Sequence, residues 1–118
     1  MSRDDATLLD LVHHARLLID ILDGFDRALF LDDVRTQLAV TRLFEILGEA
    51  VKRPSPAFRE QYPEAPWWRI SGMRDVLIHS YDRVDLNRVW DAAIDEIPNL
   101  LKVIEPLVPQ PDSELPKP

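Results

Sequence analysis

Apolar residues recur at steps of three and four along most of the chain, a spacing that places them on one face of an α-helix. The pattern is clearest over residues 8–25 and 86–108. Only three glycines occur, and no stretch alternates apolar and polar residues for long enough to predict a β-strand. The chain is therefore expected to be all-α.

Two helices are expected in the first half of the chain. The first carries the apolar stripe of residues 8–25, with Asp5 or a neighbour able to cap its start and Gly24 near its end. The second runs from about residue 32 to residue 53, and Gly48 inside it costs about 1 kcal/mol relative to Ala, a cost best tolerated where two backbones approach closely. A second apolar row lies off the core-facing stripe of this helix and indicates a contact beyond its own core, at Leu31, Val34 and Leu38.

The second half of the chain is expected to hold two more helices. Residues 54–65 form a Pro-containing connection with room for one short helical turn, and Pro66 suits the first position of the helix that follows. Asp85 can cap the last helix, which should kink at Pro98, continue, and end between residues 106 and 109. These elements predict an antiparallel four-helix bundle over residues 7–108, followed by a disordered Pro-rich tail over residues 109–118.

Composition limits the classes of function. The chain has 118 residues, a net charge of −7 and no cysteine, which excludes disulfides and Cys-based zinc sites. Neither a secretory signal nor a membrane-spanning apolar run is seen, so a cytoplasmic location with no membrane is expected. The acidic balance argues against a broad basic face for nucleic acid. However, residues 52–88 hold seven Lys or Arg against five acids, so an anion-binding surface is expected in that segment.

The stretch RDVLIHSY, residues 74–81, combines an arginine, a histidine and a tyrosine. On an ideal helix Arg74 and Tyr81 share a face, whereas His79 lies about 140° around the axis from Arg74. For the two to cooperate, the helix must unwind before His79 or two copies of the chain must combine their groups. The alternative is structural: Arg74 forms a surface ion pair with Asp75 or another acid, and His79 stabilises carbonyl groups at a helix end.

Other groupings carry weaker signals. His13 and His14 are adjacent and project about 100° apart, so they do not form the i, i+4 pair of a metal site, and no metal ligand set is predicted. Glu45 and Glu49 share a face, where pairing with Arg42 or solvent is the simpler interpretation, although Glu49 is also a candidate to orient the motif. The two tryptophans could stack on a base, but one is expected in the core and the other at the surface, Trp67 and Trp68.

Several segments in order resemble the HEPN superfamily, and within it the HepT-like toxins of toxin–antitoxin pairs. The motif R-x4-H-x-Y is met by Arg74, His79 and Tyr81. The stretches AVTRLFEILGEA, PWWRISGMRD and YDRVDLNRVWDAA are similar to the family's segments around that motif, and the likeness covers roughly residues 7–106. One departure is Asp75, where many members have Asn and where a negative charge repels phosphate unless a basic group neutralises it.

The resemblance implies a metal-independent endoribonuclease without cofactor, acting at a homodimer interface in a type VII-like toxin–antitoxin system. Arg74 would hold the phosphate, and His79, with the imidazole's ordinary pKa of about 6.5, would move protons. Asp75 and Glu49 are candidate supporting residues. An MntA-like nucleotidyltransferase antitoxin would silence the RNase by AMPylation of Tyr81. The alternative is a non-catalytic helical subunit that binds a nucleotidyltransferase and its nucleotide.

Overall fold

The computed structural model describes residues 2–79 and 83–108, with His79 described by its backbone alone. The predicted tail, residues 109–118, and Tyr81 lie outside the described residues. Within the described part the chain is helical, with no strand. The elements in order are α1 Arg3–Ile21, α2 Arg27–Asp32, α3 Val34–Ala50, α4 Pro56–Gln61, α5 Trp67–His79, α6 Leu86–Ile104 and the 3₁₀ turn Glu105–Leu107.

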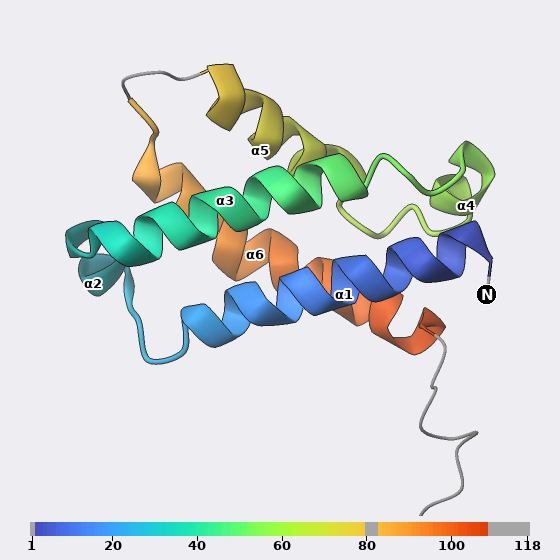
Figure 1. Cartoon of the computed structure of the whole chain (residues 1–118), viewed down its shortest axis with the longest axis horizontal. Helices are drawn as coiled ribbons and strands as arrows, with labels where there is room; N and C mark the ends of the chain where they lie inside the picture. The colour runs from blue at the N-terminus through green and yellow to red at the C-terminus, as the bar shows by residue number, and fades with distance from the viewer. Residues whose placement is uncertain (1, 80–82, 109–118) are drawn as a thin grey trace, which may run out of the picture.

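The four long helices α1, α3, α5 and α6 form the bundle predicted from the apolar spacing (Figure 1). α3 lies at its centre and contacts α1, α5 and α6. The short helices α2 and α4 lie at opposite ends of α3 (Figure 1). The all-α prediction is therefore confirmed, and so is the short helical turn within residues 54–65, which is α4.

Helix starts follow the capping side chains in the sequence. Ser2 and Asp5 form a reciprocal capping box at the start of α1, Asp33 accepts from two backbone N–H groups at the start of α3, and Asp85 caps α6. The last helix continues past Pro98, as predicted, but ends at Ile104, two residues before the predicted range, and a 3₁₀ turn follows it. Each cap supplies partners for N–H groups that the first turn of a helix cannot pair internally.

One helix was not predicted. α2 has six residues, too few to show a helical period, and it is capped by Asp26, whose carboxylate accepts from the Leu29 N–H. It is fixed by Phe30, which is fully buried and lies 5.4 Å, centroid to centroid, from the ring of Trp90 on α6. Burying such a side chain contributes about 1.5–3 kcal/mol. The second predicted helix is α3, which begins at its N-cap Asp33, in agreement with the expected start, and ends at Ala50, three residues before the expected end.

The core that this arrangement encloses runs the length of the bundle. It takes the stripe residues of α1, α3 and α6, together with one face of α5 formed by Trp67, Ile70, Met73 and Leu77. Arg74 follows Ile70 by four residues, so it lies at the edge of this inward face, half-buried, whereas Asp75 lies on the exposed side of α5. Among the described helices, none has both the length and the hydropathy to span a bilayer.

Candidate functional site

Helix α5 approaches α3 most closely where Gly48 faces Arg74. A Cβ built on Gly48 would lie 2.3 Å from the Cβ of Arg74 and 3.1 Å from the carbonyl oxygen of Ile70, both well inside van der Waals contact. The glycine therefore lets the two backbones approach, as predicted from its place inside a helix. This contact sets the stem of Arg74 directly against α3.

Arg74 is held there by carboxylates. Its Nε lies 3.3 Å from Oε2 of Glu49, and its Nη1 lies 3.6 Å from Oδ1 of Asp75. The same Asp75 oxygen lies 3.8 Å from Nζ of Lys52. The Arg74 side chain is 27% exposed, so its guanidinium is reachable from solvent while its stem is packed. Arg74 and Lys52 therefore neutralise the charge of Asp75, which reduces the repulsion of phosphate expected from that charge.

A cavity of about 270 Å³ opens beside Arg74, between α3 and α5. Two further arginines, Arg42 and Arg53, line it, and Ile46 and Ile78 supply apolar walls. Glu45 and Glu49 complete the lining, and Arg42 Nη1 pairs with Oε2 of Glu45 at 3.1 Å. Three guanidinium groups therefore border one hollow, each beside a carboxylate of the same chain.

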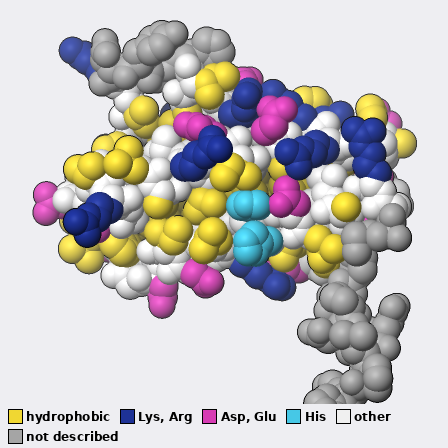
Figure 2. All heavy atoms as spheres, viewed as in Figure 1, with side chains coloured by type: hydrophobic (Ala, Val, Ile, Leu, Met, Phe, Trp, Pro, Cys, Tyr) yellow, Lys and Arg dark blue, Asp and Glu magenta, His cyan; other side chains and the backbone are white. Residues whose placement is uncertain are grey.

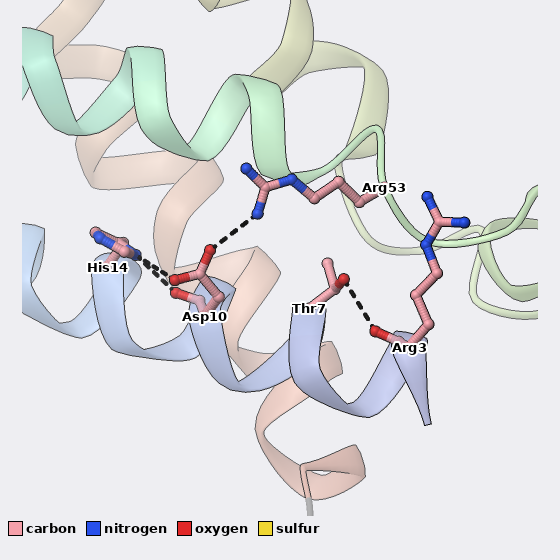
Figure 3. A network of polar contacts seen from close by, with 5 residues as sticks. All are labelled: Arg3, Thr7, Asp10, His14 and Arg53. Atoms are coloured by element: carbon pink, nitrogen blue, oxygen red, sulfur yellow. Dashed lines mark hydrogen bonds and ion pairs between the residues drawn. The ribbon is translucent and has the colours of Figure 1, made fainter. Parts of the chain in front are cut away.

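The third arginine links the cavity to α1 (Figure 3). Arg53 Nη1 lies 3.2 Å from Oδ2 of Asp10, and the other Asp10 oxygen lies 3.3 Å from Nδ1 of His14. That ring nitrogen also lies 2.8 Å from the Asp10 carbonyl oxygen, which only accepts, so Nδ1 carries the proton and donates. The Thr7 hydroxyl takes no part in this network of Arg53, Asp10 and His14; it donates a hydrogen bond to the carbonyl oxygen of Arg3 (Figure 3).

The backbone of α5 is helical through His79. The alternative in which the helix unwinds before His79 is therefore not the arrangement found. Arg74 and His79 lie on one continuous helix, about 140° apart around its axis and about 7.5 Å along it. The His79 side chain and all of Tyr81 lie outside the described residues.

The remaining sequence predictions fall as follows. Trp67 is in the core, 4% exposed, with its Nε1–H bonded to the Tyr62 carbonyl at 2.9 Å, whereas Trp68 is 71% exposed. The predicted apolar row is exposed, with Val34 and Leu38 at 64% and 66%, but Leu31 belongs to α2 and not to the same helix as the other two. Hydrophobic side chains gather at the end formed by α2 and the start of α3, while basic and acidic ones mix toward the other end (Figure 2).

Within residues 2–79 and 83–108, no three His, Asp or Glu side chains are grouped as a metal site.

Sequence reasoning missed the part that Arg53 plays. It follows the end of α3, so helical periodicity does not place it, and only tertiary packing brings it to the cavity. The predicted pairing of Arg42 with the acids on its own face of α3 is confirmed for Glu45, whereas Glu49 pairs with Arg74.

Comparison with known proteins identifies the class. Residues 11–107 match the family described as Ribonuclease HepT-like. A protein of Thermococcus cleftensis named "Probable ribonuclease HepT" is 40% identical over 93 residues, covering 75% of this chain and 84% of that protein. One of Methanocaldococcus jannaschii named "Putative RNase MJ0127" is 36% identical over 109 residues, covering 92% and 90%.

The chain belongs to the HepT-like ribonuclease family. No solved structure matches it significantly. The Arg74 cavity lies within the matched residues, and the resemblance stated from the R-x4-H-x-Y motif and its flanking segments is confirmed at the level of the family.

Proposed function

We propose that this protein is a metal-independent endoribonuclease toxin whose active site combines Arg74 and His79 at a homodimer interface. Membership of the family and the names of its relatives support cleavage of RNA. The observation that carries the site is Arg74, packed against Gly48 with its guanidinium at the mouth of a cavity bordered by two more arginines.

The ion pairs around Arg74 suit exchange for a phosphate. Pairs between partly exposed side chains contribute only about 0–1 kcal/mol each, so breaking one costs little. An RNA phosphate can replace Glu49 on the guanidinium with two parallel hydrogen bonds, a geometry that arginine's fork matches. Glu49 is then a positioning residue, which holds the guanidinium toward the cavity until RNA binds.

The imidazole of His79 would carry out the proton transfers. The ribose 2′-hydroxyl attacks the adjacent phosphorus, the P–O5′ bond breaks, and the products are a 2′,3′-cyclic phosphate and a 5′-hydroxyl. The histidine accepts the 2′-hydroxyl proton as a general base and then, as the imidazolium, protonates the leaving 5′ oxygen. Arg74 balances the charge that builds on the phosphate oxygens in the transition state.

Two chains are needed because of the helix geometry. On one α5 helix the two groups point about 140° apart, so the Arg74 of one copy is expected to face the His79 of the other. The exposed apolar row at Leu31, Val34 and Leu38, with the exposed Ile78, supports a contact with a second copy on this side of α3 and α5. Burying such residues between copies removes apolar surface from water.

A mixing experiment tests the shared site. Arg74→Ala and His79→Ala homodimers should each fail to cleave RNA in the presence of EDTA. When equal amounts are unfolded together and refolded, about half of the dimers should contain one chain of each variant. Each mixed dimer keeps one of its two Arg74–His79 sites, so activity should return to about a quarter of wild type. No recovery, with mixed dimers demonstrated by two affinity tags, would show that the groups do not combine across chains. Full activity of His79→Ala alone would remove His79 from the mechanism.

Tyr81 is proposed as the control point, modified with AMP by an MntA-like nucleotidyltransferase antitoxin. A phosphate attached beside Arg74 and His79 would occupy the donors meant for RNA and repel its backbone. Cells that express Tyr81→Phe together with the antitoxin should stop growing and lose RNA integrity, while wild type with the antitoxin should grow. Rescue of both to the same extent would count against modification at Tyr81.

A second candidate is a non-catalytic subunit that binds a nucleotidyltransferase and its nucleotide. The carboxylates already bound to Arg74 favour it, since they lower the site's attraction for an RNA backbone. Purified dimer that leaves RNA intact yet forms a tight complex with the transferase would select this function.

A further inference from the structure

A second and larger cavity, of about 670 Å³, lies on another side of α5 from Arg74. It is formed where α4 and the segment after it meet the start of α5 and the C-terminal half of α6. Its volume is within the range of about 300–1,000 Å³ typical of ligand sites. The side chains that matter here are Arg59, Glu60, Glu64, Trp68, Arg69 and Asn99.

Trp68 is the exposed tryptophan among the residues that line this cavity. Its side chain is 71% exposed, whereas the other two tryptophans, Trp67 and Trp90, are 4% and 8% exposed. The guanidinium carbon of Arg59 lies 5.1 Å from the centre of the Trp68 ring, so the arginine covers part of the indole. An indole left this open presents a flat π surface on which another planar group can stack.

The cavity also contains unmet hydrogen-bonding groups. Nε of Arg59 is buried and has no hydrogen-bond partner within the described ranges. Arg69 is paired with Glu96 through Nη1 and Oε1 at 3.1 Å, but Glu60 and Glu64 have no ion pair or hydrogen bond among the described side chains. A ligand for this site therefore needs a planar ring, N–H donors for carboxylates and an anionic or acceptor group for arginine.

These requirements separate the classes of ligand. A simple anion would be repelled by the carboxylates, and a lysine- or arginine-rich peptide would meet Arg59 already on the ring and Arg69 beside it. A nucleotide carries a stacking base with N–H donors and also a phosphate. Guanine fits best, because its N1–H and N2–H₂ groups can both donate to one carboxylate, while its O6 and N7 accept from arginine.

We propose that the cavity beside Trp68 is a guanine-binding subsite for single-stranded RNA, flanking the nucleotide that is cut; the proposal rests on the ribonuclease function above. Trp68 precedes Arg74 by six residues, which places it about 9 Å along α5 and about 120° around it. A strand with a phosphate at Arg74 would have to pass round α5 to stack a base on Trp68. The site therefore selects a neighbouring nucleotide and takes no part in the chemistry.

Binding of mononucleotides tests the site without cleavage. GMP should quench the tryptophan fluorescence of the full-length wild-type protein, and calorimetry should give GMP a higher affinity than AMP or UMP. Trp68→Ala should weaken GMP binding about tenfold, in line with the usual contribution of base–aromatic stacking, and Trp68→Phe should retain most of it. Because Trp68 is exposed, both variants should keep the circular dichroism spectrum and melting temperature of wild type.

Equal GMP affinity for wild type and Trp68→Ala would overturn the proposal, as would a preference for UMP or binding of a Lys-rich peptide in place of nucleotides. Arg74→Ala separates this proposal from the proposed function. If that variant binds GMP normally but no longer cleaves RNA, both stand. If it cleaves normally while GMP binding still depends on Trp68, the base site stands and the role of Arg74 fails.

For cleavage itself, Trp68→Ala should raise KM about tenfold on an RNA with guanine beside the cut and leave kcat unchanged. On the same RNA with uracil at that position, the variant and wild type should have similar KM values. A fall in kcat with KM unchanged would assign Trp68 to the chemistry and contradict the subsite.

Discussion

Substituting the two helical glycines near the site should change stability in opposite directions. Gly48 lies in α3 against Arg74, where a new Cβ would be 2.3 Å from the Arg74 Cβ. Gly72 lies inside α5, and a Cβ there would meet nothing within 4 Å. Helix propensity alone favours Ala over Gly by about 1 kcal/mol at both positions. Any difference between the variants therefore reports on packing between the helices.

The expected magnitudes follow from that contact. The Cβ of Arg74 belongs to the helix stem and cannot rotate away, so α3 and α5 would have to separate by roughly 1.5 Å to restore an ordinary carbon–carbon distance of about 3.8 Å. Such overpacking typically costs about 1–3 kcal/mol. A clash this close puts the packing cost near the upper end of that range. After the gain in helix propensity of about 1 kcal/mol is subtracted, Gly48→Ala should lose about 2 kcal/mol of stability. Gly72→Ala should gain about 1 kcal/mol.

Thermal unfolding followed by circular dichroism checks both values. At about 3–5 °C per kcal/mol for a chain of this size, Gly48→Ala should melt about 6–10 °C below wild type and Gly72→Ala about 3–5 °C above it. Protein concentrations must be matched, because association shifts the melting temperature. If Gly48→Ala melted at or above the temperature of Gly72→Ala, the close approach of α3 and α5 at Arg74 would be refuted.

Three further predictions concern charge, assembly and capping. Asp75→Asn should bind RNA up to about fivefold more tightly in a low-salt anisotropy titration, because it removes a carboxylate from Arg74; unchanged affinity would mean that Asp75 does not compete with phosphate. Leu38→Asp should convert the proposed dimer to monomer in analytical ultracentrifugation, whereas Ile94→Asp, an exposed apolar residue on α6, should leave it dimeric. Asp33→Ala should lose about 1 kcal/mol of unfolding free energy in urea, since it removes the α3 cap, and Asp32→Ala should lose little.

The sequence predicted the long helices because their apolar stripes are longer than two turns. α1, α3 and α6 each repeat the three- and four-residue step, and a period is detectable over that length. α2 could not be found in this way, since six residues contain fewer than two turns. Its position depends on one contact, Phe30 against Trp90, between residues 60 positions apart.

The candidate site was predictable in part for the same reason. Gly48 inside a helix indicated a close approach, and the motif singled out Arg74, but neither indicates which helix is approached. The role of Arg53 needed the tertiary structure, because it depends on how the segment after α3 passes over α1 to reach Asp10. Local periodicity thus predicts a residue's face, while its partner is set by how the helices pack.

The ion pairs also constrain how RNA can bind to the proposed enzyme. Each arginine at the cavity has a carboxylate from its own chain, so a bound phosphate displaces that carboxylate instead of filling an unpaired positive site. Fewer counterions are then released per phosphate than for an open basic surface, and affinity should fall less steeply with salt. With a net charge of −7 as well, long-range attraction contributes little. We therefore expect affinity to come from short-range contacts, the proposed bidentate phosphate at Arg74 and the proposed stacked base at Trp68.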